Sequence, residues 1–419
     1  MSNAPRAPLM SLDAALQALL THVHPLTRFE TVATLDADGR FLAQNVVSAL
    51  QVPAFDNSSM DGYAVRSADV QHSGVELTVT QRIAAGHFGD QLLPGQTARI
   101  FTGAPVPLGA DAVVMQEQTE SIVGQDVSRV KFLFAPEAGQ WIRRSGEDVK
   151  AGDTVLMRGQ KLGPAELGLV ASLGLSHVQV MARPKVALFS TGDELVMPGD
   201  VAPGDMRPGA IYNSNRFFLR ALLQRMGCEV SDLGIVPDRR DATVAALQSA
   251  AEHHDLIVTS GGVSVGEEDH VKPAVQSLGE LALWQIAMKP GKPFAYGHVR
   301  RDSLPGAAHF VGLPGNPVSS FITFLLLVKP LILTFQGAAP KPPVAYRLPA
   351  HFDLPKADKR REFLRVRRNA QGGLDLFPNQ SSGVLTSVVW GDGVVDNPAE
   401  QTIVHGDMLN FWSFSEWLS

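Results

Sequence analysis

At 419 residues the chain is too long for one compact core, which predicts about three or four domains. An apolar content of 45% with 19% charged residues excludes a disordered chain, and a net charge of −6 gives no general attraction to nucleic acid or to an anionic membrane. The single cysteine, Cys228, excludes disulfides within the chain and cysteine-ligated zinc or iron–sulfur clusters, and fits a reducing cytoplasm.

The first part of the chain predicts a helix followed by a β-rich domain. Apolar residues from Leu12 to Leu20 recur at helical spacing, which indicates a packing helix. Residues 75–160 alternate short β-like runs with glycine and proline, which is typical of a small β domain. Residues 164–173 are predicted to be helical, and Arg183-Pro184 marks a domain boundary.

Three loops in this part are candidates for ligand binding. Residues 51–66, QVPAFDNSSMDGYAVR, form a polar loop with apolar anchors that presents carboxylates, among them Asp61. The segments Thr102 to Pro105 and Arg143 to Asp148 are the other two. The alternative interpretations are a turn-rich surface loop and a solvated ion-pair cluster.

From Lys185 the pattern changes to alternating strand and helix. Strands are predicted at 186–190, 229–235 and 256–259, with helices at 214–226 and 241–253. Such alternation indicates a doubly wound, mostly parallel sheet, on which ligands gather at the carboxyl ends of the strands. Polar residues follow each predicted strand there, namely Thr191 to Glu194, Asp238, and Ser260 to Gly262.

The glycine loop after the third strand has the composition of a phosphate-binding loop. Gly261, Gly262 and Gly266 let backbone N–H groups turn toward a ligand, and Pro273 predicts that a helix begins a few residues earlier. The acidic side chains of residues 267–269, Glu-Glu-Asp, would repel an anion by itself. They would bind an anion through an Mg²⁺ ion that the anion and the carboxylates both coordinate. An ordinary strand-to-helix turn is the alternative.

Downstream segments add cationic groups and a third domain type. Residues 288–293, MKPGKP, place two lysines on a proline-stiffened turn, and Asn316-Pro317 opens a buried helix that is short for a membrane span. No Walker A or GxGxxG sequence is present. After a proline-rich linker at 337–345, short β-like runs with a basic cluster around Arg365 predict a small β-barrel or sandwich.

Together these motifs resemble one family, the molybdopterin molybdotransferases, which are similar to the E domain of gephyrin. The resemblance rests on DNSSMDGYAVR (56–66), FTGAPVP with GADAVV (101–114), GEDV (146–149), STGDEL (190–195), SGGVSVGEED (260–269), KPGKPF (289–294), LPGNPVS (313–319) and EFLRV (362–366). The resemblance implies a cytoplasmic homodimer of multidomain α/β plus β architecture. Its domains would be a discontinuous helical domain (1–50 and 150–182), a β-rich domain (51–149), a central doubly wound, mostly parallel α/β domain (183–336) and a C-terminal β-barrel (337–419).

The resemblance also implies a reaction, in which molybdate enters adenylylated molybdopterin and AMP is released. The implied catalytic residues are Asp61, Thr102, Asp148, Glu194, Asp238 and Asp269, of which Glu194 and Asp269 would bind Mg²⁺ or a similar divalent cation. The implied cofactor-binding residues are Ser190, Gly192, Gly261, Gly262, Ser264, Pro314 and Asn316. Molybdate or phosphate would be received by Lys289, Lys292, Ser319, Arg365, Ser381 and Ser382.

The implied partners are small-molecule substrates, with a molybdopterin adenylyltransferase upstream and apo-molybdoenzymes downstream, and neither nucleic acid nor a membrane. Two alternatives stay open. Adenylyl transfer onto molybdopterin would need only residues 183–334, although the loop at 56–64 argues against it. A scaffold similar to gephyrin is the other, but this chain has no fused partner domain.

Overall fold

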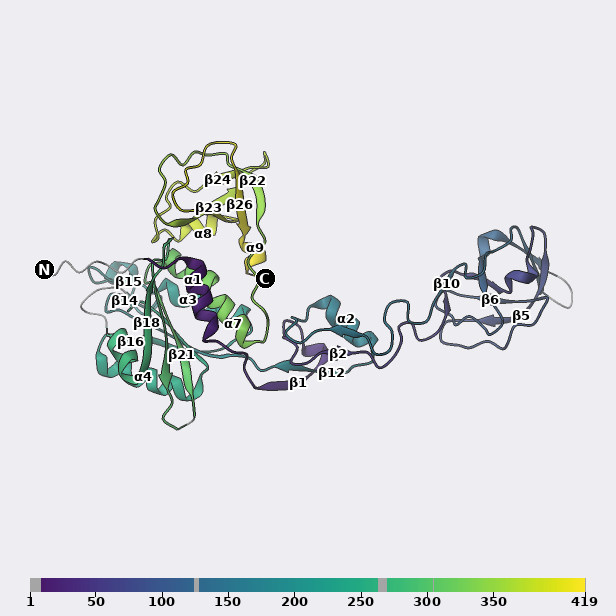
Figure 1. The fold of residues 1–419 in the computed structure, drawn as a ribbon, viewed down its shortest axis with the longest axis horizontal. Helices are drawn as coiled ribbons and strands as arrows, with labels where there is room; N and C mark the ends of the chain where they lie inside the picture. The colour runs from purple at the N-terminus through teal and green to yellow at the C-terminus, as the bar shows by residue number, and fades with distance from the viewer. Residues whose placement is uncertain (1–8, 124–127, 263–269, 304, 419) are drawn as a thin grey trace. The chain divides into compact units, whose positions relative to one another are not determined.

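The computed structural model describes residues 9–123, 128–262, 270–303 and 305–418, and Figure 1 shows the ribbon. The chain divides into two compact units, which are described separately. Unit 1 comprises Met1–Glu30, Gly39–Ala43 and Gln179–Ser419, and unit 2 comprises Thr31–Asp38 and Gln44–Val178.

Unit 2 contains a six-stranded sheet in the region predicted to be β-rich, with the order β7-β4-β6-β5-β9-β8. Its strands are β4 (Gly62–Val65), β5 (Glu76–Ile83), β6 (Gln96–Ile100), β7 (Ala112–Met115), β8 (Thr119–Val123) and β9 (Ser128–Phe132). Successive side chains of a strand point to opposite faces, so Tyr63 and Ala64 of β4 lie in two different apolar clusters. Both faces of the sheet are therefore covered.

The predicted helical domain is mostly not helical. Helix α1 (Leu12–Thr21) packs in unit 1, and α2 (Pro164–Ser172) is the one α-helix among the described residues of unit 2. The other elements of the predicted helical domain are a 3-10 turn (Thr34–Asp36) and two pairs of short strands, β1 (Phe29–Ala33) with β12 (His177–Met181) and β2 (Val46–Val47) with β11 (Thr154–Leu156). A third short pair, β3 (Asn57–Ser58) with β10 (Ile142–Arg143), lies within the region predicted to be β-rich. These pairings join segments far apart in sequence, so no local pattern indicates them.

The central sheet of unit 1 is mixed, with the order β16-β13-β17-β21-β20-β18. Its strands are β13 (Lys185–Thr191), β16 (Glu229–Val236), β17 (Leu256–Ser260), β18 (Gly279–Gln285), β20 (Pro293–Arg300) and β21 (Ala307–Leu313). The first four strands in the order are parallel, as the alternating pattern predicts, while β20 and β18 are antiparallel additions that it does not indicate. A short parallel pair, β14 (Leu195–Val196) and β15 (Ile211–Tyr212), lies outside this sheet.

Helices cover both faces of the central sheet, which makes the parallel part doubly wound. One face packs against α1, α3 (Ser214–Arg225), α6 (Pro317–Thr323), the π-helical segment η5 (Phe324–Val328) and α7 (Lys329–Phe335), and the other against α4 (Arg240–His253) and α5 (Val271–Leu278). Cys228 is buried in the first of these clusters, and burial raises the pKa of its thiol to about 12, which fits a structural cysteine. The run Pro317–Phe335 is long and apolar enough to cross a membrane, but a buried core helix passes the same test and 78% of its apolar window is buried.

The C-terminal part of unit 1 forms a six-stranded half-barrel, with the order β19-β23-β25-β26-β22 and β24 paired to β23. Its elements are β19 (Met288–Lys289), β22 (Tyr346–Pro349), β23 (Arg361–Arg368), β24 (Leu374–Leu376), β25 (Gly393–Asn397), β26 (Met408–Ser413) and the short helices α8 (Thr386–Trp390) and α9 (Phe414–Trp417). The strand order ends at β19 and β22, but Ala350, next to β22, forms a bridge to Leu374 of β24, and the backbone N–H of His351 donates to the Leu374 carbonyl at 2.9 Å, so the two sides of the sheet also meet there. Strand β19 comes from the lysine turn, so that turn is one edge of the C-terminal sheet.

Candidate functional site

The carboxyl ends of three neighbouring parallel strands bring the predicted loops to one edge of the central sheet. Strand β13 ends at Thr191, β17 at Ser260 and β21 at Leu313, and the register pairs Ser260 with Leu313. The loop after β13 turns at Gly192, whose φ of 142° is one that residues with a side chain rarely adopt. Gly192, Glu194, Gly261, Gly262 and Pro314 therefore lie in loops at the same edge of the sheet, and Ser190 is the second-last residue of β13.

Both described glycines of the glycine loop are required by close packing. A Cβ on Gly261 would lie 2.8 Å from the Thr191 carbonyl oxygen, and one on Gly262 would lie 3.0 Å from Thr191 Oγ1. Both residues have positive φ, at 92° and 68°. The loop thus closes onto the end of β13. Ser264 and the acidic residues 267–269, which include Asp269, lie outside the described residues, so their predicted roles stay predictions.

Three buried polar atoms lie near this edge. Ser190 Oγ, Thr259 Oγ1 and Asn213 Nδ2 are buried, and within the described parts of the chain they have no hydrogen-bond partner. Buried polar groups are nearly always satisfied by protein or by ordered water. Sequence reasoning missed Asn213 and its neighbour Asn215; the asparagines on both sides of Ser214 at a helix start were the available signal.

The lysine turn is held by carboxylates of the C-terminal sheet. Lys289 Nζ lies 2.9 Å from Glu362 Oε1 and 3.2 Å from Asp358 Oδ2. Burial acts to lower the pKa of Lys289, but the hydrogen bonds and charges of these two carboxylates outweigh it and the pKa is raised. An oxyanion would have to compete with both carboxylates for Lys289. Lys292 has no ion pair among the described residues.

Arg365 is a buried cation without a carboxylate partner. Its side chain is 1% exposed, and it donates to Ser387 Oγ at 3.1 Å, the Phe363 carbonyl at 2.9 Å and, weakly, the Ser381 carbonyl at 3.4 Å. No ion pair to it occurs among the described residues, and desolvation lowers its pKa to about 10. Backbone N–H of Val318 donates to the Ser382 carbonyl at 3.0 Å. Arg365, the 381–382 loop and the start of α6 with the buried Ser319 are therefore assembled together.

The predicted residues of unit 2 form a separate cluster that is described by itself. Asp61 Oδ1 accepts hydrogen bonds from the backbone N–H and the hydroxyl of Thr102, both at 2.8 Å, and the backbone hydrogen bond is the main reason that the pKa of Asp61 is lowered. Asp148 is exposed on the neighbouring loop, which Asp56 ties down through Arg144 at 2.6 Å. Asp61 is thus held as an exposed carboxylate.

Metal ligands are sparse in the described chain. Glu194 is an exposed carboxylate at the end of β13, and Asp238 is half-buried after β16. Within the described ranges no group of three or more His, Cys, Asp or Glu side chains is arranged to hold a metal ion. Among the described residues, Glu194 is therefore the carboxylate at the strand ends that is placed to share a metal ion with a bound ligand.

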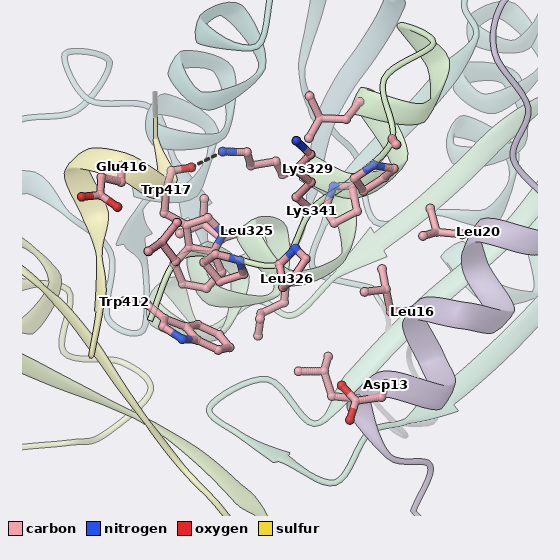
Figure 2. Close-up of a pocket in the computed structure, with 18 of the residues that line it drawn as sticks. Asp13, Leu16, Leu20, Leu325, Leu326, Lys329, Lys341, Trp412, Glu416 and Trp417 are labelled. Carbon is pink, nitrogen blue, oxygen red and sulfur yellow. Dashed lines mark hydrogen bonds between the residues drawn. The ribbon is translucent and has the colours of Figure 1, made fainter. Parts of the chain in front are cut away.

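A cavity of about 480 Å³ lies elsewhere in unit 1, between α1, the helical run 325–333, the linker at 338–344 and β26 with α9 (Figure 2). Trp412, Trp417 and Leu326 point into it, and Lys329 Nζ bonds the Trp417 carbonyl. None of the predicted site residues lines this cavity, so it plays no part in the chemistry of the strand-end site.

A mixed α/β domain with glycine and cationic loops at the carboxyl ends of its parallel strands defines a class of protein that binds an anionic small molecule there. The family models that match are the MoeA N-terminal region (domain I and II) at residues 10–174, a probable molybdopterin binding domain at 187–334 and the MoeA C-terminal region (domain IV) at 347–414. The chain belongs to the molybdopterin molybdenumtransferase family.

Relatives match along most of the chain. The chain is 42% identical over 372 residues to a molybdopterin molybdenumtransferase of Haemophilus influenzae, covering 88% of this chain and 89% of the relative. It is 36% identical over 414 residues to one of Nostoc sp., covering 96% and 92%. Among solved structures it is similar to a molybdopterin biosynthesis moeA protein from Pyrococcus horikoshii OT3, with a TM-score of 0.83, 27% identity and coverage of 97% and 100%.

Proposed function

We propose that this protein is an enzyme of molybdenum cofactor biosynthesis that inserts molybdate into adenylylated molybdopterin and releases AMP. The observation that carries the proposal is the buried Arg365 guanidinium, which forms no ion pair among the described residues, feels only the more distant charge of Glu362, and lies beside the 381–382 loop and the start of α6. A buried cation without an ion-pair partner is costly, and a bound oxyanion would supply one. Family membership supports the choice of molybdate as that oxyanion.

The proposed roles follow the geometry of unit 1. Arg365, Lys292 and Ser319 would bind molybdate, with Lys289 released from Glu362 and Asp358 when the anion arrives. Ser190, Gly192, Gly261, Gly262, Pro314 and Asn316 would hold the pterin and its phosphates at the strand ends, where backbone N–H groups can donate to phosphate oxygens. Asp61, Thr102, Asp148, Asp238, Ser264, Asp269, Ser381 and Ser382 stay in the proposed site on sequence grounds.

The described carboxylates could bind Mg²⁺ only together with the phosphates of a bound substrate. Mg²⁺ commonly uses one or two protein carboxylates together with substrate phosphates, so the exposed Glu194 carboxylate in the loop that follows β13 would serve as one of them. When bound, the ion would neutralise the charge on the phosphoanhydride. Glu194 would orient it, and Asp269 is its proposed second ligand. We also propose a cytoplasmic homodimer that receives its substrate from an adenylyltransferase and delivers the cofactor to apo-molybdoenzymes.

The test measures AMP released from adenylylated molybdopterin by the purified protein, with and without molybdate. Molybdate-dependent release is the expected result, because hydrolysis of the phosphoanhydride is coupled to insertion in this proposal. Formation of adenylylated molybdopterin from ATP and molybdopterin, with no effect of molybdate, would instead identify an adenylyltransferase. A protein that binds the pterin but does neither would support the scaffold alternative.

A further inference from the structure

Ser387, in the short helix α8, is a fully buried hydroxyl that contacts the Arg365 guanidinium. Its Oγ accepts a hydrogen bond from Arg365 Nε at 3.1 Å and donates one to the Val384 carbonyl at 2.7 Å. A serine hydroxyl has one hydrogen, and here that hydrogen is used on Val384. The hydroxyl is therefore fixed as an acceptor for Arg365.

The other contacts of the guanidinium leave hydrogen-bond donors unused beside the 381–382 loop. Arg365 Nη1 donates to the Phe363 carbonyl at 2.9 Å, and Nη2 reaches the Ser381 carbonyl only at 3.4 Å. Each of these nitrogens carries two hydrogens, so each keeps one that makes no hydrogen bond among the described residues. Two such N–H groups on one planar guanidinium are the pair that binds two oxygens of an oxyanion.

Gln380 fixes the backbone of Arg365 separately. On this side of β23, β19 pairs as far as Glu362 and β24 pairs from Val366 onward, so Arg365 lies between the two ladders. The Gln380 amide takes the place of a strand there: its Oε1 accepts from the Arg365 backbone N–H at 2.9 Å, and its Nε2 donates to the Arg365 carbonyl at 3.0 Å. What Ser387 holds is therefore the direction of the guanidinium and not the position of its backbone.

We propose that Ser387 is a positioning residue, which orients the Arg365 guanidinium so that its two Nη groups face the incoming oxyanion. The inference rests on the proposed function, in which that oxyanion is molybdate. With alanine at position 387 the buried Nε–H would lose its acceptor, and an unsatisfied buried donor is unfavourable, so the guanidinium would turn toward another acceptor. A misdirected cation weakens the binding of molybdate, whereas kcat at saturating molybdate stays nearly unchanged.

The experiment compares two buried serines that make the same kinds of hydrogen bond. Ser48, in unit 2, is 2% exposed; its Oγ donates to the Leu50 carbonyl at 2.6 Å and accepts from the Leu50 backbone N–H at 3.3 Å. Ser387→Ala and Ser48→Ala each remove one such hydroxyl, and melting curves check that both variants fold. Molybdate binding is measured by calorimetry without the pterin, and kcat and the KM for molybdate are measured by AMP release.

Ser387→Ala should weaken molybdate binding and raise its KM by about tenfold or more with kcat within about twofold, whereas Ser48→Ala should leave all three within about twofold. Ser387→Cys is the second variant, because it nearly preserves the side-chain volume while its sulfur is only a weak acceptor, and it should weaken molybdate binding in the same direction. Molybdate affinities of both Ser387 variants within about twofold of the wild type would overturn the inference.

A second readout follows Arg365 itself. In protein made with isotope-labelled arginine, the Nε–H resonance that is missing from Arg365→Met belongs to Arg365. That resonance should keep its position in Ser48→Ala, and it should shift and exchange faster with water in Ser387→Ala. An unchanged resonance in Ser387→Ala would also overturn the inference.

Failure of the inference and failure of the proposed function are distinguishable. If the wild type binds molybdate but releases no AMP in response to it, the proposed function fails alone, because calorimetry and the Nε–H resonance need no turnover. If AMP release depends on molybdate and the KM of Ser387→Ala equals that of the wild type, the inference fails alone.

Discussion

Replacing Arg365 with methionine should cost little stability and abolish the response to molybdate. Methionine has similar length and no charge, so it fills the same space within β23. An arginine in a buried ion pair would behave differently, because removing it leaves its carboxylate partner buried and unpaired, at a cost of about 3–5 kcal/mol. Arg365 has no such carboxylate among the described residues.

The expected change in the free energy of unfolding is the difference between the desolvation cost of the buried Arg365 charge and the hydrogen bonds that Arg365 makes. Desolvation lowers the pKa of Arg365 from 12.5 to about 10, which corresponds to about 3 kcal/mol against the charged form at about 1.4 kcal/mol per pKa unit. The three hydrogen bonds to Ser387, Phe363 and Ser381 return about 1 kcal/mol each. The sum is near zero, so Arg365→Met should change the free energy of unfolding by no more than about 1–2 kcal/mol.

The assay is urea unfolding in anion-poor buffer, repeated with molybdate. At a concentration one hundred times its dissociation constant, molybdate should stabilise the wild type by about 2.7 kcal/mol and the Arg365→Met variant not at all. Arg361→Met is the matched control on the same strand, since Arg361 pairs with Asp396 at 2.6 Å. That variant should lose stability yet keep the molybdate response. A loss of 3–5 kcal/mol in Arg365→Met, or an undiminished molybdate response, would refute the reasoning.

Three further outcomes are expected. Glu194→Gln should weaken the Mg²⁺ dependence of AMP release by about tenfold or more, since a carboxylate ligand is lost; an unchanged Mg²⁺ titration would remove Glu194 from the metal site. Lys292→Ala should weaken molybdate binding more than Lys289→Ala, because Lys289 already bonds two carboxylates, and the reverse order in titrations would contradict this. Burial, with the charge of His298 adding to it, lowers the pKa of His309 to about 4, so the folded protein should lose stability as pH falls from 6.5 to 4; urea unfolding across that range should show a flatter profile for His309→Gln, and an equally steep one would exclude this histidine.

The sequence by itself determined three of the four parallel strands, the helices between them and the loops at their carboxyl ends. The strand predicted at 186–190 is β13 (Lys185–Thr191), and the helix predicted at 241–253 is α4 (Arg240–His253). Such strands and helices can be predicted from the sequence, because the spacing of apolar residues along one segment depends on that segment alone. The glycine loop and the strand-end position of Glu194 follow from the same local pattern, since parallel strands must end at one edge.

Only the tertiary structure decided which charges and amides meet at the site. Lys289 contacts a carboxylate 73 residues away, and Asn215 bonds atoms 45 and 100 residues away. The burial of Arg365 within an otherwise basic, exposed-looking segment is likewise invisible in the sequence, as are the antiparallel strands β18 and β20 and the α1 helix that packs on the α/β core. The physical reason is the same in each case: such contacts arise from packing between segments distant along the chain, and neither periodicity nor residue type records which distant partner a side chain meets.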